Sequence, residues 1–210
     1  DCIAHENVVN SISVIVPATF TIPQRREVET IVRGAGFKFL RAIDDTEAAS
    51  NIYSLEKFNK FSQQAKTVLF VDVGATSIKS YCIRFELEKD ETQKYGIPQA
   101  TRLSYVYSSE QGGAYLTKEL VLFIISKYNL TNLNDAEYQR LFMAAEKIKI
   151  KLTLLKSATG YADNILGEDR EITISRDELD AISDSLIQKT IETAKKASED
   201  IEFDDIEVIG

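Results

Sequence analysis

The chain has 210 residues, enough for one large domain or two lobes. Apolar residues make up 44% and charged residues 28%, which is typical of a globular protein rather than a disordered or collagen-like one. The net charge of −8 argues against binding nucleic acid or an anionic membrane by bulk charge, although backbone N–H groups can still bind a phosphate locally. No apolar run approaches the ~20 residues that span a bilayer, so we expect no membrane span.

Cysteine and histidine are scarce. Cys2 and Cys82 cannot form a disulfide framework, and the single histidine, His5, leaves no Cys/His cluster for zinc. A Ser–His–Asp triad would depend on His5 near the N-terminus, so we do not expect one. The chain opens without a signal peptide and stops after an apolar segment, and we expect it to be a fragment of a longer protein.

The first third of the chain alternates between strand and helix patterns. A β-branched run predicts a strand over residues 13–16, and Pro23 begins a helix that the glycines at 34 and 36 end. A second strand is predicted over residues 37–43, followed by a helix that starts at the acidic residues 44 and 45. The polar stretch 56–66 is interpreted as a loop that crosses between lobes.

The middle of the chain has the pattern of a three-stranded meander over residues 67–108. A continuous apolar strand, 67–73, is followed by a small-residue turn and by an alternating, half-buried strand from residue 81. Residues 89–99 are predicted to form a charged hairpin tip, and Leu103, Tyr105 and Tyr107 a third alternating strand.

The last part is mainly helical. Helices are predicted over residues 116–128 and 134–155, the second starting with a capping box of Asn134 and Glu137. A hairpin over 158–174 precedes a helix capped by Ser175 and Glu178, and a final strand covers 206–209. The residues that we expect this last helix to bury are Leu179, Ile182, Leu186, Ile191 and Ala194.

The turn after Asp72 has the residues of a phosphate clamp. A carboxylate at the end of a strand can hold Mg²⁺ through water, and small side chains let a ligand approach the backbone. The N–H groups expected to surround the phosphate belong to Gly74, Ala75, Thr76 and Ser77. The alternative is an ordinary tight hairpin with an aspartate at its edge.

Several segments, in order along the chain, resemble the nucleotide-binding domain of the seventy-kilodalton heat-shock (DnaK-type) chaperones, which belong to the actin-like ATPase superfamily. The first three segments are VIVPATFTIPQRREV, RAIDDTEAASNIYSL and VLFVDVGATSIKSYCI. Further similarities follow in QGGAYLTKEL, AAEKIKIKLT and DIEVIG. Together these similarities are specific and cover residues 13–210, although each alone is weak.

The resemblance implies an α/β fold, namely an actin-like ATPase (ribonuclease-H-like) lobe with an inserted smaller α+β subdomain. Residues 1–65 would be the last elements of a first lobe and 66–111 the core sheet of the second. Residues 112–175 would be the inserted subdomain, and 176–210 a return to the second-lobe core. The first phosphate loop of the family would precede residue 1.

The resemblance also assigns roles to individual residues. Pro17 and Arg25 match a relay between lobes, although a helix-start loop with an exposed arginine is the alternative. Asp45 stands where the family has a glutamate near magnesium and the attacking water, and Asp72 matches the magnesium-side aspartate. Ser77 matches a threonine beside the γ-phosphate. The expected catalytic set is therefore Asp45, Asp72 and Ser77, with the two aspartates holding magnesium through water.

Lys79 is the sharpest departure, because the family has an aspartate there. An ammonium can pair with phosphate oxygens but cannot act as a carboxylate base, and the alternative is a lysine pointing to solvent in a degenerate site. Glu146, Lys149 and Thr153 match residues around the ribose and adenine, with Ile150 replacing a basic residue on the adenine. The alternative for this set is the charged face of an amphipathic helix.

The implied function is that of an ATP-binding chaperone that assists folding through nucleotide-controlled conformational change, with ATP or ADP and magnesium as cofactors. The departures resemble the large heat-shock-110 and glucose-regulated-170 relatives, so the alternative is a nucleotide-exchange factor and holdase with weak or no hydrolysis. Expected partners are unfolded client proteins and another heat-shock chaperone. A sugar kinase or filament protein is the distant alternative. The sequon at Asn129 favours the endoplasmic reticulum lumen over the cytoplasm.

Overall fold

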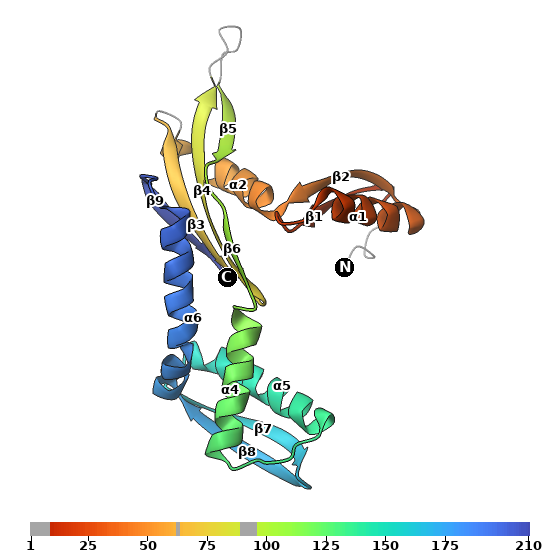
Figure 1. Cartoon of the computed structure of the whole chain (residues 1–210), viewed down its shortest axis with the longest axis vertical. Helices are drawn as coiled ribbons and strands as arrows, with labels where there is room; N and C mark the ends of the chain where they lie inside the picture. The colour runs from red at the N-terminus through yellow and green to blue at the C-terminus, as the bar shows by residue number, and fades with distance from the viewer. Residues whose placement is uncertain (1–8, 62–63, 89–95) are drawn as a thin grey trace. The chain divides into compact units, whose positions relative to one another are not determined.

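A computed structural model describes residues 9–61, 64–88 and 96–210 (Figure 1). The chain divides into two compact units. The first contains residues 1–66 and 83–101, and the second contains residues 67–82 and 102–210. His5, Cys2 and the tip of the predicted hairpin at 89–95 lie outside the described residues.

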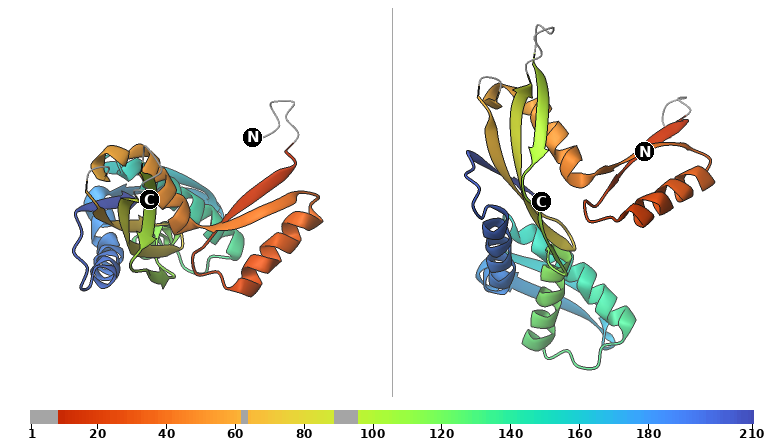
Figure 2. Two further views of the ribbon diagram at one scale, coloured as in Figure 1. Left: turned by 90° about the horizontal axis from the view of Figure 1, so that it is seen from above. Right: turned by 45° about the horizontal axis from the view of Figure 1, so that its top comes forward.

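The first unit opens with a strand–helix–strand motif, as predicted. The parallel pair consists of β1 (Ser11–Val16) and β2 (Lys38–Asp44), and α1 (Ile22–Gly34) crosses between them (Figure 2). Parallel strands need such a crossover, and Pro23 suits the first turn of its helix because the missing N–H has no partner there. Val16 and Val32 are buried in this motif.

The first unit also contains two helices that follow β2. The helix α2 (Asp45–Glu56) is capped by the Asp44 carboxylate, which accepts the Glu47 N–H at 2.8 Å. A short helix, α3 (Phe58–Phe61), lies where a loop was predicted, so that prediction was wrong for these residues. The Phe61 ring is buried, and its centroid lies 5.5 Å from that of Phe85. Burial of this aromatic side chain explains the ordered turn in a polar segment.

The central sheet has the strand order β5-β4-β3-β9, and β6 pairs with β4. The final strand is parallel to β3, with Val68 opposite Asp205 and Asp72 opposite Ile209. The strands are β3 (Lys66–Val73), β4 (Ser77–Glu88), β5 (Ile97–Arg102), β6 (Val106–Ser109) and β9 (Asp205–Ile209).

Two sequence predictions about this sheet were wrong. Residues 97–99 were predicted to belong to the hairpin tip, but they begin β5. The third strand is divided into β5 and β6, because the chain bends at residues 103–105, where the Leu103 N–H bonds the Cys82 carbonyl and the Ser104 hydroxyl accepts the Cys82 N–H. The alternating burial predicted from Tyr81 is confirmed at Ile83, Arg84 and Phe85. The first half of β4 is buried on both faces, since Tyr81 stacks on Phe70 while Cys82 packs against Ala197.

The rest of the second unit has three helices around a two-stranded hairpin. The helices α4 and α5 and the start of α6 share one apolar core with the hairpin. Gly160 of β7 lies against Ile148, where an added Cβ would come within 2.8 Å of a side-chain carbon, so a larger residue would force the Ile148 side chain to shift. The elements are α4 (Gly113–Lys127), α5 (Asp135–Leu152), β7 (Ser157–Ile165), β8 (Glu168–Ser175) and α6 (Arg176–Ala197).

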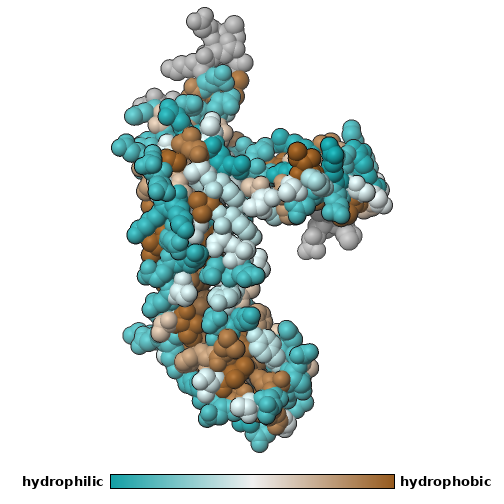
Figure 3. Space-filling view, viewed as in Figure 1, coloured by the Kyte–Doolittle hydropathy of each residue, from teal (hydrophilic) through white to brown (hydrophobic). Residues whose placement is uncertain are grey.

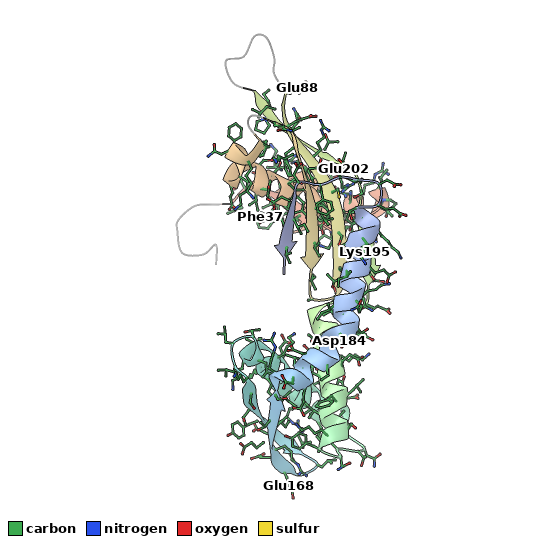
Figure 4. The ribbon with its side chains drawn as sticks, turned by 90° about the vertical axis from the view of Figure 1, so that its left-hand side faces the viewer. Phe37, Glu88, Glu168, Asp184, Lys195 and Glu202 are labelled. Carbon is green, nitrogen blue, oxygen red and sulfur yellow. The ribbon has the colours of Figure 1, made fainter. Side chains whose placement is uncertain are left out.

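The capping boxes predicted for α5 and α6 are both present. The predicted buried face of α6 is only partly right. Leu179 is buried, but Ile191 is 41% exposed, and Thr193 and Ala197 are buried instead. The two ends of this helix pack on different cores, so one apolar stripe does not describe it. Figure 4 shows Asp184 and Lys195 projecting from α6, with Glu168 at the distant end of the β7–β8 hairpin.

The surface over α4 carries apolar side chains, as the space-filling view shows (Figure 3). Leu122 on this helix is 47% exposed. Among the described residues, none of the helices combines the length and apolarity that crossing a bilayer requires.

Candidate functional site

The turn between β3 and β4 is tight and open to solvent. The Gly74 N–H donates to the Ser77 carbonyl at 2.9 Å, which closes the turn, while Ala75 and Thr76 are exposed. Within the described part of the chain, no partner accepts the backbone N–H of Ala75 or Thr76. Two N–H donors therefore remain for an anion at the turn. The Gly74 N–H was predicted to donate to the phosphate, but in the structure it is already bonded to the Ser77 carbonyl.

Ser77 is the first residue of β4. The residue is only 9% exposed, and it pairs with Ser109 of β6. A nearly buried hydroxyl at this place is less accessible to a ligand than the two exposed N–H groups of the turn. The role of Ser77 beside a γ-phosphate stays a prediction.

Asp72 and Lys79 form an ion pair at the foot of the turn. The Lys79 Nζ lies 3.0 Å from the Asp72 Oδ2, and the two side chains are 15% and 20% exposed. The lysine therefore does not point to solvent, which was one of the two sequence alternatives. The register of the hairpin would have predicted this pair. When residues 74 and 77 close the turn, residue 72 lies opposite residue 79 on the neighbouring strand.

Magnesium does not fit well beside this pair. Two unit charges 4 Å apart interact by about 4 kcal/mol at the effective dielectric constant near a protein surface, and a divalent ion doubles the repulsion from the ammonium. Within the described ranges, no group of three or more His, Cys, Asp or Glu side chains is arranged to hold a metal ion. Asp45, the other predicted magnesium-side carboxylate, belongs to the first unit, whereas Asp72 belongs to the second.

The start of α4 rests directly on the turn. The N–H groups of Gly113 and Ala114 donate to the carbonyls of Gly74 and Ala75, at 3.0 and 2.8 Å. Gly112 has φ +136°, and a Cβ there would lie 2.3 Å from the Gly74 oxygen, so no other residue fits. Neither Gly112 nor Gly113 was predicted to belong to the site, although two adjacent glycines before a helix are a signal of such a close approach.

Glu146 and Lys149 of α5 belong to a polar network that reaches α4. The Lys149 ammonium donates to the Gly113 carbonyl, the Thr117 hydroxyl and the Glu146 carboxylate, each at 2.8 Å. The Thr117 hydroxyl, which is fully buried, also contacts the Glu146 carboxylate. Burial raises the pKa of Glu146, but the hydrogen bonds from Lys149 and Thr117 outweigh it and lower the pKa overall.

Glu146 and Lys149 are thus connected to the turn through Gly113. The other two predicted adenosine-side residues, Ile150 and Thr153, do not belong to this network. Ile150 is 58% exposed, and the Thr153 hydroxyl donates to the Ile150 carbonyl at 2.7 Å at the end of the helix. Their contact with a base stays a prediction.

The three predicted site residues of the first unit meet at one loop. The Phe20 N–H donates to the Pro17 carbonyl at 2.9 Å, and the Arg25 Nε donates to the Phe20 carbonyl at 3.1 Å. The Asp45 carboxylate accepts the Ala18 N–H at 3.0 Å. Arg25 and Asp45 therefore hold the loop that follows β1 from two sides.

Comparison with known proteins identifies the family. The family model described as "Hsp70 protein" matches residues 3–210. The chain belongs to the Hsp70 family. It is 27% identical to a heat shock protein homolog of Naumovozyma castellii over 96% of the chain and 30% of that protein. It is 25% identical to "Chaperone protein HscA homolog" of Acinetobacter baylyi, over 97% of the chain and 31% of the relative.

A third relative is "Chaperone protein DnaK" of Psychrobacter cryohalolentis, which is 27% identical over 94% of the chain and 31% of its own length. The chain therefore spans about a third of the length of the curated relatives that it matches. The mixed strands and helices agree with the actin-like ATPase fold of an Hsp70 protein. The division at 112–175 into an inserted subdomain stays a prediction.

Proposed function

We propose that this Hsp70-family chain forms part of an ATP-binding domain in a molecular chaperone and that its β3–β4 turn receives the phosphates. The exposed turn supports this most strongly, because within the described residues the N–H groups of Ala75 and Thr76 have no acceptor and lie beside small side chains that admit a ligand. Such paired amides bind anions without a net positive charge, which suits an acidic chain. ATP or ADP is the proposed ligand, and client proteins are the proposed partners.

A second candidate is a co-chaperone that holds nucleotide and turns it over slowly or not at all. The ion pair of Lys79 with Asp72 favours it, because the carboxylate near the phosphates is already neutralised. Such a protein would act on another heat-shock chaperone as a nucleotide-exchange factor and would hold unfolded clients. The membership of the Hsp70 family counts against a sugar kinase or a filament protein.

One sequence prediction concerned the compartment. The endoplasmic reticulum lumen was predicted from the sequon at Asn129, which follows α4 with φ +53°. The comparisons do not support that location.

Replacement of Ala75 by glutamate tests where the nucleotide binds. A carboxylate on the exposed turn repels a polyphosphate and leaves the core unchanged, so we expect Ala75→Glu to weaken ATP binding by the intact protein at least ~10-fold, which corresponds to about 1.4 kcal/mol. Isothermal titration calorimetry with ATP measures this directly. Ala181→Glu is the matched control, since Ala181 is exposed on α6.

We expect the control to bind ATP like the unaltered protein. Equal affinity of Ala75→Glu and Ala181→Glu would mean that the phosphates do not lie at this turn. Absence of ATP binding by the unaltered intact protein would contradict the proposed function itself.

A further inference from the structure

We infer that the Lys79 ammonium takes the place of a divalent cation beside Asp72, so that this lobe binds the phosphates of a nucleotide without magnesium. The inference rests on the proposed function, because it concerns the ligand of the same turn. Where the family resemblance implies a magnesium ion, this chain has the Lys79 ammonium.

The position of the ammonium carries the inference. Lys79 extends from β4 toward β3 and lies 3.0 Å from Asp72, with only 15% of its side chain exposed. Both residues are held by regular strands of one sheet, so the ammonium is fixed close to the turn rather than moving through solvent. Its charge therefore stands at the foot of the turn that carries the N–H groups of Ala75 and Thr76.

A hydrated magnesium ion would compete with this ammonium for the same carboxylate. Magnesium demands near-octahedral oxygen ligands and usually keeps several waters, which need room that a lysine side chain fills. In the described residues, no further acidic cluster stands ready to offset the added charge. The Lys79 ammonium already occupies the position beside Asp72, so a magnesium ion would have to displace it from that carboxylate.

An ammonium suits the phosphate role in a limited way. It is a compact point charge with three donors, so it can contact a carboxylate and a phosphate oxygen together. It carries half the charge of magnesium and cannot bridge two phosphate oxygens as closely as a metal does. It therefore supports binding better than it supports transfer of the phosphoryl group, which relies on a metal to neutralise developing charge.

The test compares ATP binding by the intact protein in magnesium and in EDTA. We expect the affinity of the unaltered protein for ATP to change less than ~3-fold between the two buffers. Lys79→Asp removes the ammonium and adds a carboxylate, so its affinity should fall at least ~10-fold in EDTA and recover with magnesium, a difference of about 1.4 kcal/mol. Lys189→Asp is the matched control, because Lys189 is also paired with a carboxylate, that of Glu192, but on the exposed face of α6.

A second measurement uses the metal without nucleotide. Mn²⁺ replaces magnesium in electron paramagnetic resonance, and bound Mn²⁺ loses the signal of the free ion. We expect Lys79→Asp to bind one Mn²⁺ more than the unaltered protein and than Lys189→Asp. Lys79→Gln, which removes the charge with little change in size, keeps the test decisive if Lys79→Asp does not fold, because ATP affinity in EDTA should fall for this variant too.

The outcomes separate the inference from the proposed function. A loss of ATP affinity of ~10-fold or more on removing magnesium from the unaltered protein would overturn the inference and leave nucleotide binding intact. Equal Mn²⁺ binding by the unaltered protein and Lys79→Asp would overturn it as well. If ATP binds in neither buffer, the proposed function fails first.

Discussion

At the scale of single residues, the most consequential departure that the resemblance implies is a reversed charge. A lysine where the resemblance implies an aspartate changes the formal charge at position 79 by two units, and its ammonium lies 3.0 Å from the Asp72 carboxylate. A carboxylate held by an ammonium is a poor base and a poor metal ligand. The residue that departs most from the pattern therefore bears most directly on whether the protein turns ATP over.

Lys79→Asp should increase ATP hydrolysis by the intact protein. The substitution frees Asp72 and supplies a second carboxylate for a magnesium ion, which neutralises charge that develops during phosphoryl transfer. We expect slow turnover before the substitution and an increase in kcat of at least ~10-fold after it, or about 1.4 kcal/mol in the barrier. Phosphate release under saturating ATP measures both rates.

The exposed variant Lys189→Asp should leave this rate unchanged. Rapid hydrolysis by the unaltered protein would contradict the second candidate function, since it would show that an ammonium beside Asp72 does not prevent turnover.

At the scale of elements, the helices and most strands were predictable because their patterns are local. Capping boxes before α5 and α6 and the apolar run of β3 depend on residues within a few positions of each other. The parallel pairing of β9 with β3 and the bend at residues 103–105 depend on contacts more than a hundred positions apart or on partners across the sheet. Those features could not be predicted from periodicity.

The candidate site shows the same division. The turn and its small residues could be predicted from the sequence. Which of its N–H groups can donate to an anion could not. The N–H of Gly74 is used by the hydrogen bond that closes the turn, which the sequence does not reveal. The packing of α4 on the turn depends on Gly112, which is 38 positions after Gly74. The network of Lys149 with Thr117 needed the packing of α4 on α5.

Glu137 links α5 to the β7–β8 hairpin and makes that link sensitive to acid. Its carboxylate accepts the N–H of Asn134 at 2.9 Å and that of Leu166 at 2.9 Å. These two hydrogen bonds lower the pKa of Glu137 below its ordinary value. The folded state therefore binds the proton less readily than the unfolded state, so this contribution to stability is present above the unfolded pKa of about 4.3 and is lost as the pH falls through the lower folded pKa.

We expect Glu137→Gln to lower the urea midpoint at neutral pH and to reduce its decline between pH 5 and pH 3, a range set about the ordinary glutamate pKa of about 4.3. Urea unfolding followed by circular dichroism at several pH values measures this. Glu171→Gln, at an exposed position of β8, is the control and should keep the original pH dependence. An unchanged slope for Glu137→Gln would show that this carboxylate does not link folding to pH.

At the scale of the whole molecule, the chain is a family member that spans about a third of its curated relatives. Its two compact units contain different parts of the predicted site, with Pro17, Arg25 and Asp45 in the first and Asp72 with the turn in the second. Because the chain spans only that share of its curated relatives, we expect a complete nucleotide site to need more than these residues.

Residues 1–210 alone should neither hydrolyse ATP nor bind it tightly. The turn offers a triphosphate the N–H groups of Ala75 and Thr76 and a carboxylate that Lys79 neutralises, which are few of the contacts that this ligand requires. We therefore expect an affinity at least ~100-fold below that of the intact protein, or about 2.8 kcal/mol. Calorimetry on both proteins under the same buffer measures the ratio, with circular dichroism as the check on folding. A tight magnesium-dependent signal from the short chain would contradict the expectation.

Gly112 has a consequence for how the lobe tolerates divergence. The distance between α4 and the β3–β4 turn is set by main chain against main chain, because the Cβ position of residue 112 would lie 2.3 Å from the Gly74 oxygen. Substitution of side chains at neighbouring surface positions does not change this distance. A single methyl group at residue 112 would push α4 and the turn apart. We therefore expect tolerance of substitution to fall abruptly at this one glycine, even in a chain that shares only 27% of its residues with a relative.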